Sequence, residues 1–239
     1  MLAGAIPTLP FEWKRGQHIA LIGDTGTGKT TVTQAILAAR RYALVLRSKA
    51  DDVIWQGYAK VRRALPALDS PMYERILLEP SFEDQWREFA IALDRAFRQG
   101  NWAVFVDDLP HVQELDRRHL LLVKRLLIMG RSVGISTITA MQRPVDVSRY
   151  SIAEARITVS FMLEGRDVQN IKDSTSPLMA EVVSGLGEHD VAMFHRPTRE
   201  VWAGRYDLEG GLFIGAYLGS GRARSRSSPS PAPIPASAR

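Results

Sequence analysis

Cysteine is absent from the 239 residues of this chain. Disulfide bonds, thiol catalysis and cysteine-ligated metal sites are therefore excluded. The five histidines have no metal-ligand spacing, and we expect each to be structural or exposed. No apolar run approaches the roughly 18 residues of a membrane-spanning helix, and Pro7 ends the apolar start too early for a secretory signal. We expect a cytoplasmic protein without an integral membrane segment.

Residues 221–239, at the C-terminal end, contain no aspartate or glutamate. The net charge is +5, and four of these charges come from Arg222, Arg224, Arg226 and Arg239, so residues 1–220 are nearly neutral. The basic balance therefore does not by itself establish nucleic-acid binding. Serine and proline dominate this end, so we expect residues 219–239 to form a disordered tail, either merely solvated or in weak contact with nucleic acid. Residues 1–14 are expected to lead into a folded domain at 15–218.

Strand and helix signals alternate through that domain. Apolar runs typical of buried strands occupy residues 18–22, 42–46, 75–78, 102–106, 135–141 and 157–163, and a closing pair lies at 190–195 and 200–206. Helical composition or spacing is found at 29–40, 81–99 and 119–129. This order predicts an α/β fold, with a mostly parallel central sheet flanked by helices and an antiparallel pair of strands at one edge.

Two stretches allow more detailed predictions. Residues 81–84 fit a helix capping box, after which Trp86, Phe89 and Phe97 recur at helical spacing and are expected in the core. The basic segment 58–63 follows Trp55 and could either face DNA or form a solvated helix face.

The most specific motif is the run from Gly23 to Thr30, which matches the phosphate-binding loop (Walker A) pattern G-x-x-x-x-G-K-[ST] at every fixed position. A strand-like run precedes it and a helix-like run follows it, as a phosphate loop requires. Glycines let backbone N–H groups curl around phosphate oxygens, and the helix N-terminus adds a positive dipole end. We expect ATP to contact this set of residues: Gly23, Asp24, Thr25, Gly26, Thr27, Gly28, Lys29, Thr30 and Thr31.

Catalytic roles within the loop follow from its chemistry. Lys29 is expected to reach the β- and γ-phosphates, and Thr30 to ligate Mg²⁺. The apolar run 102–106 ends in Asp107 and Asp108. Asp107 is expected to hold Mg²⁺ through water, and Asp108 to polarise the attacking water, which favours hydrolysis over a kinase or a simple switch.

A third strand-like run, residues 135–141, ends in Gln142. An amide at this edge of the sheet can hydrogen-bond both the γ-phosphate and the attacking water. Gln142 is therefore our candidate for a residue that detects intact ATP.

These segments together resemble the FtsK/SpoIIIE and HerA division of P-loop motors. The resemblance rests on Gly130–Ile135 running into Met141–Pro144, on Ala155–Phe161 followed by Arg166 and Asp167, and on Gly185–Phe194. It spans roughly residues 15–206.

The resemblance implies a RecA-like ATPase core, usually assembled as a hexameric ring that moves double-stranded DNA. Such rings complete each site with an arginine from the neighbouring subunit, which neutralises charge on the transferred phosphate. Arg131 and Arg156 are equal candidates here. Arg143 is a third candidate, although Pro144 favours a role in shaping its loop.

The chain also departs from the family. Asp108 replaces the commoner glutamate and is one methylene shorter, so hydrolysis could be slow. We expect neither a DNA-gripping domain before the motor core nor a winged domain after it, and this expectation favours viral DNA packaging or mobile-element transfer over chromosome segregation. Such a protein would lie in the host cytoplasm or with the virion and could meet a capsid or membrane-channel partner. Two alternatives remain: a nucleotide-switched interaction module, and a secretion or pilus ATPase acting on a protein.

Overall fold

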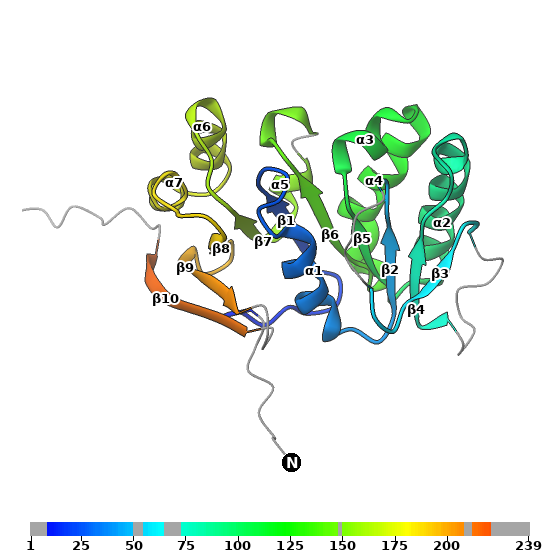
Figure 1. The fold of residues 1–239 in the computed structure, drawn as a ribbon, viewed down its shortest axis with the longest axis horizontal. Helices are drawn as coiled ribbons and strands as arrows, with labels where there is room; N and C mark the ends of the chain where they lie inside the picture. Colours follow the sequence, from blue (N-terminus) through cyan, green and yellow to red (C-terminus); the bar gives the residue numbers. More distant parts are fainter. Residues whose placement is uncertain (1–8, 50–54, 65–72, 148–149, 208–211, 221–239) are drawn as a thin grey trace, which may run out of the picture.

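The computed structural model describes residues 9–49, 55–64, 73–147, 150–207 and 212–220. These form one ten-stranded sheet with helices packed on it (Figure 1). The strands are β1 (His18–Ile22), β2 (Ala43–Leu46), β3 (Ala59–Val61), β4 (Arg75–Leu78), β5 (Ala103–Val106), β6 (Ser136–Met141), β7 (Ala155–Ser160), β8 (Asp190–His195), β9 (Glu200–Asp207) and β10 (Leu212–Ser220). The helices are α1 (Lys29–Ala38), α2 (Gln85–Gln99), α3 (Leu109–Glu114), α4 (Arg117–Met129), α5 (Tyr150–Ala153), α6 (Gly165–Ser174) and α7 (Pro177–Ser184). Short 3₁₀ turns are η2 (Phe82–Asp84), η3 (Gly130–Val133) and η4 (Pro144–Asp146).

The sheet runs in the order β10-β9-β8-β7-β1-β6-β5-β2-β4-β3. All neighbours from β7 to β3 pair in parallel, whereas β7–β8, β8–β9 and β9–β10 pair antiparallel. The predicted α/β fold with an antiparallel edge is therefore confirmed. The sequence did not reveal β10, which pairs with β9 and runs to Ser220, two residues into the stretch that we assigned to the tail. The tail arginines lie outside the described residues.

The position of β6 between β1 and β5 determines where the functional segments meet. Because these strands are parallel, the loops after Ile22, Val106 and Met141 all leave the same edge of the sheet. The phosphate loop, the acidic pair and Gln142 are therefore brought to one edge by topology alone.

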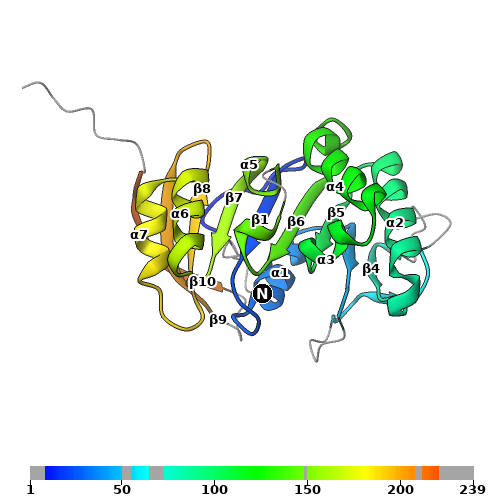
Figure 2. The same cartoon turned by 90° about the horizontal axis from the view of Figure 1, so that it is seen from above.

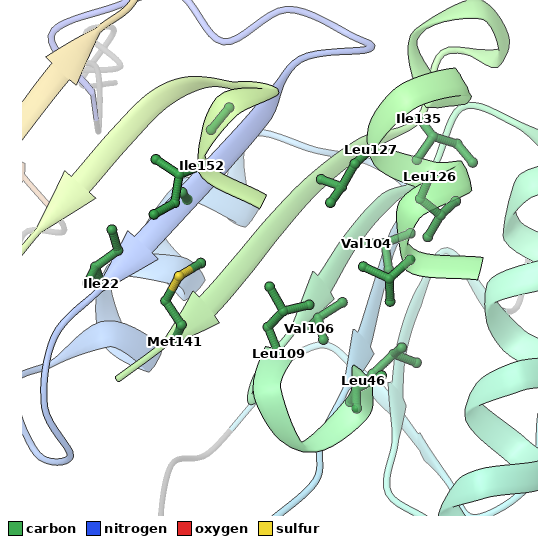
Figure 3. Packing of buried hydrophobic residues seen from close by; sticks show 14 of the residues in the cluster. Ile22, Leu46, Val104, Val106, Leu109, Leu126, Leu127, Ile135, Met141 and Ile152 are labelled. Atoms are coloured by element: carbon green, nitrogen blue, oxygen red, sulfur yellow. The ribbon is translucent and has the colours of Figure 1, made fainter. Parts of the chain in front are cut away.

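Side chains alternate between the two faces of the sheet, and each face has its own core. Ile22, Leu46 and Val106 pack with α2 to α7, and Figure 3 shows part of this cluster. Ile19, Val45 and Phe105 pack on the other face with α1. Seen from above, α1 lies on the side of the sheet away from α4 and α5 (Figure 2). No helix in the described ranges is long and apolar enough to cross a membrane.

One core prediction is wrong. Trp86 is 53% exposed, whereas Phe89 is fully buried and Phe97 is nearly so. In the first turn of α2 the inward position is taken by Gln85, which is 3% exposed, so Trp86 points away. The expected capping box is also not formed as predicted, because Ser81 Oγ donates to Asp84 Oδ2 at 3.0 Å and no side chain caps η2.

The aromatic–basic stretch at 55–63 does not form the helix that was one of its two interpretations. It contains β3, the strand at the edge of the sheet opposite β10. Trp55 is buried, and its ring packs against Tyr58 and Phe105, with ring centroids 5.1 and 5.9 Å apart.

Candidate active site

The loop between β1 and α1 has the backbone shape of a phosphate cradle. Gly26 and Gly28 have φ values of +85° and +103°, a conformation that a side chain strains. At Gly23 a Cβ atom would lie 2.8 Å from Phe161 Cβ. Phe161 follows β7, and the sequence pattern gave no sign that its ring supports the loop. The glycines at 23 and 28 are therefore needed for packing and for conformation, respectively.

The N-terminus of α1 is open to an anion. Gly28 precedes the helix in a left-handed conformation, and no side chain caps the first turn. The first N–H groups of a helix have no partner within the helix itself, so these donors are available for phosphate oxygens.

Lys29 extends back over the loop. Its Nζ donates to the carbonyl oxygens of Gly23 at 2.6 Å and Asp24 at 2.7 Å. Burial lowers the pKa of Lys29, and the nearby carboxylates of Asp107, Asp24 and Asp108 oppose this shift. Asp24 O also accepts from Thr27 Oγ1 at 2.8 Å. Gly23, Asp24 and Thr27 thus shape the loop from within.

A cavity of about 440 Å³ joins the predicted site residues. Its lining includes Lys29, Asp107, Asp108 and Gln142, which come from α1, the loop after β5 and the loop after β6. The other predicted nucleotide contacts that line it are Thr25, Gly26, Gly28, Thr30 and Thr31. Residues far apart in sequence therefore face one space large enough for a phosphate chain.

The donors in this cavity fit Mg²⁺. Thr30 supplies a hydroxyl oxygen and Asp107 a carboxylate, and both line the same space. Mg²⁺ prefers such hard oxygen ligands and fills its remaining positions with water and substrate phosphates. No group of three or more His, Asp or Glu side chains suited to a metal occurs among the described residues, so an all-protein metal cage is not found there.

Lys49 is a site residue that the sequence analysis missed. It lies beyond β2, lines the cavity, and places its Nζ 2.6 Å from Asp108 Oδ2. The other oxygen of Asp108 accepts from the backbone N–H of His111 at 3.4 Å, at the start of α3. Both oxygens of the predicted catalytic carboxylate are therefore engaged within the protein.

Partly buried polar contacts hold residues 47–49, which follow β2 and are called the Lys49 segment below, in place. Gln85 Nε2 donates to Ser48 O at 2.8 Å, and Gln85 Oε1 lies 2.6 Å from His111 Nε2. Arg47 Nε donates to Lys49 O at 3.1 Å. The first turn of α2 thus links the Lys49 segment to α3, which begins directly after Asp108.

Arg143 has the loop-shaping role that its proline neighbour suggested. Its Nε donates to Asp167 Oδ2 at 2.9 Å, and this carboxylate raises the pKa of Arg143. Because Asp167 lies near the start of α6, the ion pair fixes the loop that carries Gln142.

Arg131 and Arg156 are not part of this cavity. Arg131 lies in η3 before β6, and Arg156 lies near the start of β7. Both line a second cavity, of about 680 Å³, together with His18 at the start of β1. The two cavities therefore lie at opposite ends of the parallel strands, and neither arginine lines the 440 Å³ cavity of its own chain.

Comparisons with known proteins agree with this architecture. A family model described as the type IV secretion-system coupling protein DNA-binding domain matches residues 3–46, less than a fifth of the chain. Comparison with curated proteins gives no significant match.

Solved structures match over most of the chain. The DNA-packaging ATPase B204 from Sulfolobus turreted icosahedral virus is 16% identical, with 80% of this chain and 98% of that chain covered and a TM-score of 0.56. The genome packaging NTPase B204 from Sulfolobus turreted icosahedral virus 2, in complex with ATP-gammaS, is 16% identical, with coverage of 77% and 94% and a TM-score of 0.58. EssC (ATPases 2 and 3) from Geobacillus thermodenitrificans is 12% identical, with coverage of 77% and 39% and a TM-score of 0.52. The chain therefore shares the fold of these NTPases and ATPases, and its motifs resemble those of the FtsK–HerA division of P-loop motors.

Proposed function

We propose that this chain binds ATP with Mg²⁺, hydrolyses it, and uses the free energy to move double-stranded DNA during packaging or transfer. The observation that carries the proposal is the 440 Å³ cavity, in which Lys29, Thr30, the acidic pair and Gln142 meet. The DNA part is supported by the packaging ATPases and the coupling-protein domain to which the chain is similar.

Each residue has a defined part in this proposal. Lys29 and the open N-terminus of α1 bind the phosphates. Thr30, and Asp107 through water, would hold Mg²⁺, which would neutralise charge on the phosphate oxygens. Asp108 polarises the attacking water. Gln142 hydrogen-bonds the γ-phosphate and that water, and so reports whether ATP is intact.

Lys49 adds a dependence on the triphosphate. In the structure the Nζ atom of Lys49 forms an ion pair with Oδ2 of Asp108. A γ-phosphate in the same cavity competes for the ammonium group, since phosphate is the more highly charged acceptor. Binding of ATP then releases Asp108 from Lys49, so that its carboxylate can polarise water. Asp108 remains inactive as a base until ATP has bound.

The proposed working form is a homo-oligomeric ring, with a hexamer as the expected size. Arg131 and Arg156 line the second cavity, which lies at the opposite end of the strands from the phosphate loop of the same chain. In the ring they would therefore act on the nucleotide of a neighbouring copy. A capsid or membrane-channel protein would be a further partner.

The direct test is ATP hydrolysis by the purified chain with and without double-stranded DNA. We expect DNA to stimulate the rate and Lys29→Ala to lower it by about a hundredfold or more, because a charged phosphate ligand is lost. Lys172→Ala, at an exposed lysine on α6, is the matched control and should hydrolyse ATP normally. Normal hydrolysis by the Lys29→Ala protein would show that the site is assigned wrongly.

A second candidate is a nucleotide-switched module that binds a protein, including one of a secretion or pilus system. The engagement of both Asp108 oxygens favours it, since a restrained base slows turnover. Tight ATP binding with a slow rate that DNA does not change would support this candidate instead of the motor.

A further inference from the structure

We propose that the second cavity is a binding site for a phosphate group, separate from the phosphate loop. It has a volume of about 680 Å³ and lies where β1, β6 and β7 begin. The inference concerns the binding site alone and requires neither hydrolysis nor DNA movement by the chain.

The lining of this cavity is strongly basic. Its cations are Lys14, Arg15, Arg131, Arg156 and Arg196, against one carboxylate, Glu154. Lys14 pairs with Glu12 at 3.1 Å. Among the described residues, no ion pair joins a carboxylate to Arg15, Arg131 or Arg156. The cavity thus gathers three arginines that no carboxylate of the described residues pairs with, and such a concentration of positive charge attracts an anion.

Two buried nitrogen atoms here lack a partner within the described chain. His18 is 3% exposed, and its Nδ1 accepts from the backbone N–H of Thr137 at 3.2 Å. The proton of the neutral ring therefore lies on Nε2, which has no hydrogen-bond partner. Arg156 Nε is also buried and unpartnered. Buried donors are normally satisfied, and these two unsatisfied N–H groups belong to residues in the wall of one basic cavity, which favours a hydrogen-bond acceptor bound beside them.

The walls of the cavity are held in place by the protein. Arg196 donates to Ala155 O and Ile152 O at 2.9 Å each, and so fixes the turn before β7. Gly16 N–H donates to Ser136 Oγ at 3.1 Å, which holds the segment before β1 against the start of β6. A cavity built on fixed backbone keeps its shape without the ligand and loses little entropy when it binds.

The donors favour phosphate over other anions. Guanidinium groups match the geometry of phosphate oxygens and can bind them through two hydrogen bonds. Arg131 and Arg156 come from separate elements, so they can approach different oxygens of one group. The phosphate can belong to a nucleotide held by a neighbouring copy or to a DNA backbone, and the chemistry recognised is the same.

The test is calorimetric titration of inorganic pyrophosphate into the full chain carrying Lys29→Ala, which weakens the phosphate loop. We expect binding to remain, and to weaken about tenfold in Arg131→Gln and in Arg156→Gln, each made in that background. Arg118→Gln removes an equal charge from an exposed position in the first turn of α4, whereas Arg131 lies beyond the last turn of that helix. This control variant should leave the affinity unchanged. Arg131 is itself exposed, so its variant is expected to fold even if Arg156→Gln does not.

Loss of all binding in the Lys29→Ala protein would overturn the site, as would equal affinity in the arginine variants. Displacement of pyrophosphate by a short DNA duplex assigns the phosphodiester as the ligand, and displacement by a non-hydrolysable ATP analogue assigns the nucleotide. Displacement by neither would overturn the recognition of phosphate esters. Because the phosphate loop is disabled in every arm, failure here leaves the proposed hydrolysis untouched.

Discussion

His18 shows how one buried side chain makes stability depend on pH. Burial lowers its pKa from 6.5 to about 4. The unfolded chain therefore takes up a proton at this position between pH 6.5 and 4, whereas the folded chain does not. Proton uptake by the unfolded state lowers the free energy of unfolding. The part of this free energy that depends on His18 is therefore fully present above pH 6.5 and is lost as the pH falls toward 4.

We expect His18 to account for roughly 3 kcal/mol of lost stability between neutral pH and pH 4. Urea unfolding at a series of pH values measures this loss. His18→Asn keeps an oxygen where Nδ1 accepts from Thr137 and cannot be protonated, so its stability should fall less steeply over the same range. Parallel pH profiles of the two proteins would rule out the assignment.

The sequence predicted the residues of the site that belong to a continuous motif. Lys29 and Thr30 follow from the loop pattern, and Asp107 and Asp108 from a strand that ends in two acids. Lys49 was missed because nothing near it in sequence marks it. Its contact with Asp108 joins residues 59 positions apart and exists only after β2 and β5 pair.

At the scale of elements, α2 carries two aromatic residues that differ in exposure. Phe89 is completely buried between α2 and the sheet, whereas Trp86, three residues earlier, is more than half exposed. Helical spacing alone could not distinguish them, because it fixes the relative angle of side chains and not which side faces the sheet. The choice was made by Gln85, whose amide is drawn inward by Ser48 and His111.

We expect Phe89→Ala to lower the free energy of unfolding by about 3–5 kcal/mol, because it leaves a cavity in the core. Trp86→Ala should change it by about 0.5 kcal/mol or less, as for other surface substitutions. Denaturant titration of the two variants beside the unmodified chain measures both effects. A large loss in Trp86→Ala would contradict the exposed position of this ring.

At the scale of the whole molecule, the order of strands decides which predicted residues act together. Placing β6 between β1 and β5 gathers the phosphate loop, the acids and Gln142 at one edge. Arg131 and Arg156 lie at the opposite end of the strands, because they precede β6 and begin β7, respectively. The sequence predicted strands and their direction but not their order, because the order depends on pairing between distant segments.

Arginines at the far edge lead to a prediction about mixed assemblies. We expect Lys29→Ala and Arg156→Gln each to abolish DNA-stimulated hydrolysis alone. After mixing and reassembly, about a quarter of neighbouring pairs in a head-to-tail ring combine an intact phosphate loop with an intact arginine. Hydrolysis should then recover in proportion, and mixing with Arg131→Gln tests the other arginine in the same way. A mixture as inactive as its components would exclude action across the interface.

β1 and β6 each run from the basic cavity toward the 440 Å³ cavity. β1 begins at His18, which lines the basic cavity, and ends at Ile22, directly before the phosphate loop. Arg131 lies in the turn before β6, and Gln142 follows the end of β6. An extended strand of five or six residues is a nearly inextensible rod about 17–20 Å long. β1 and β6 pair with each other in the middle of the sheet. A displacement along either strand is therefore absorbed little by stretching of the strand. We therefore expect a displacement at the basic cavity to reach the phosphate loop with little loss to stretching of β1 and β6.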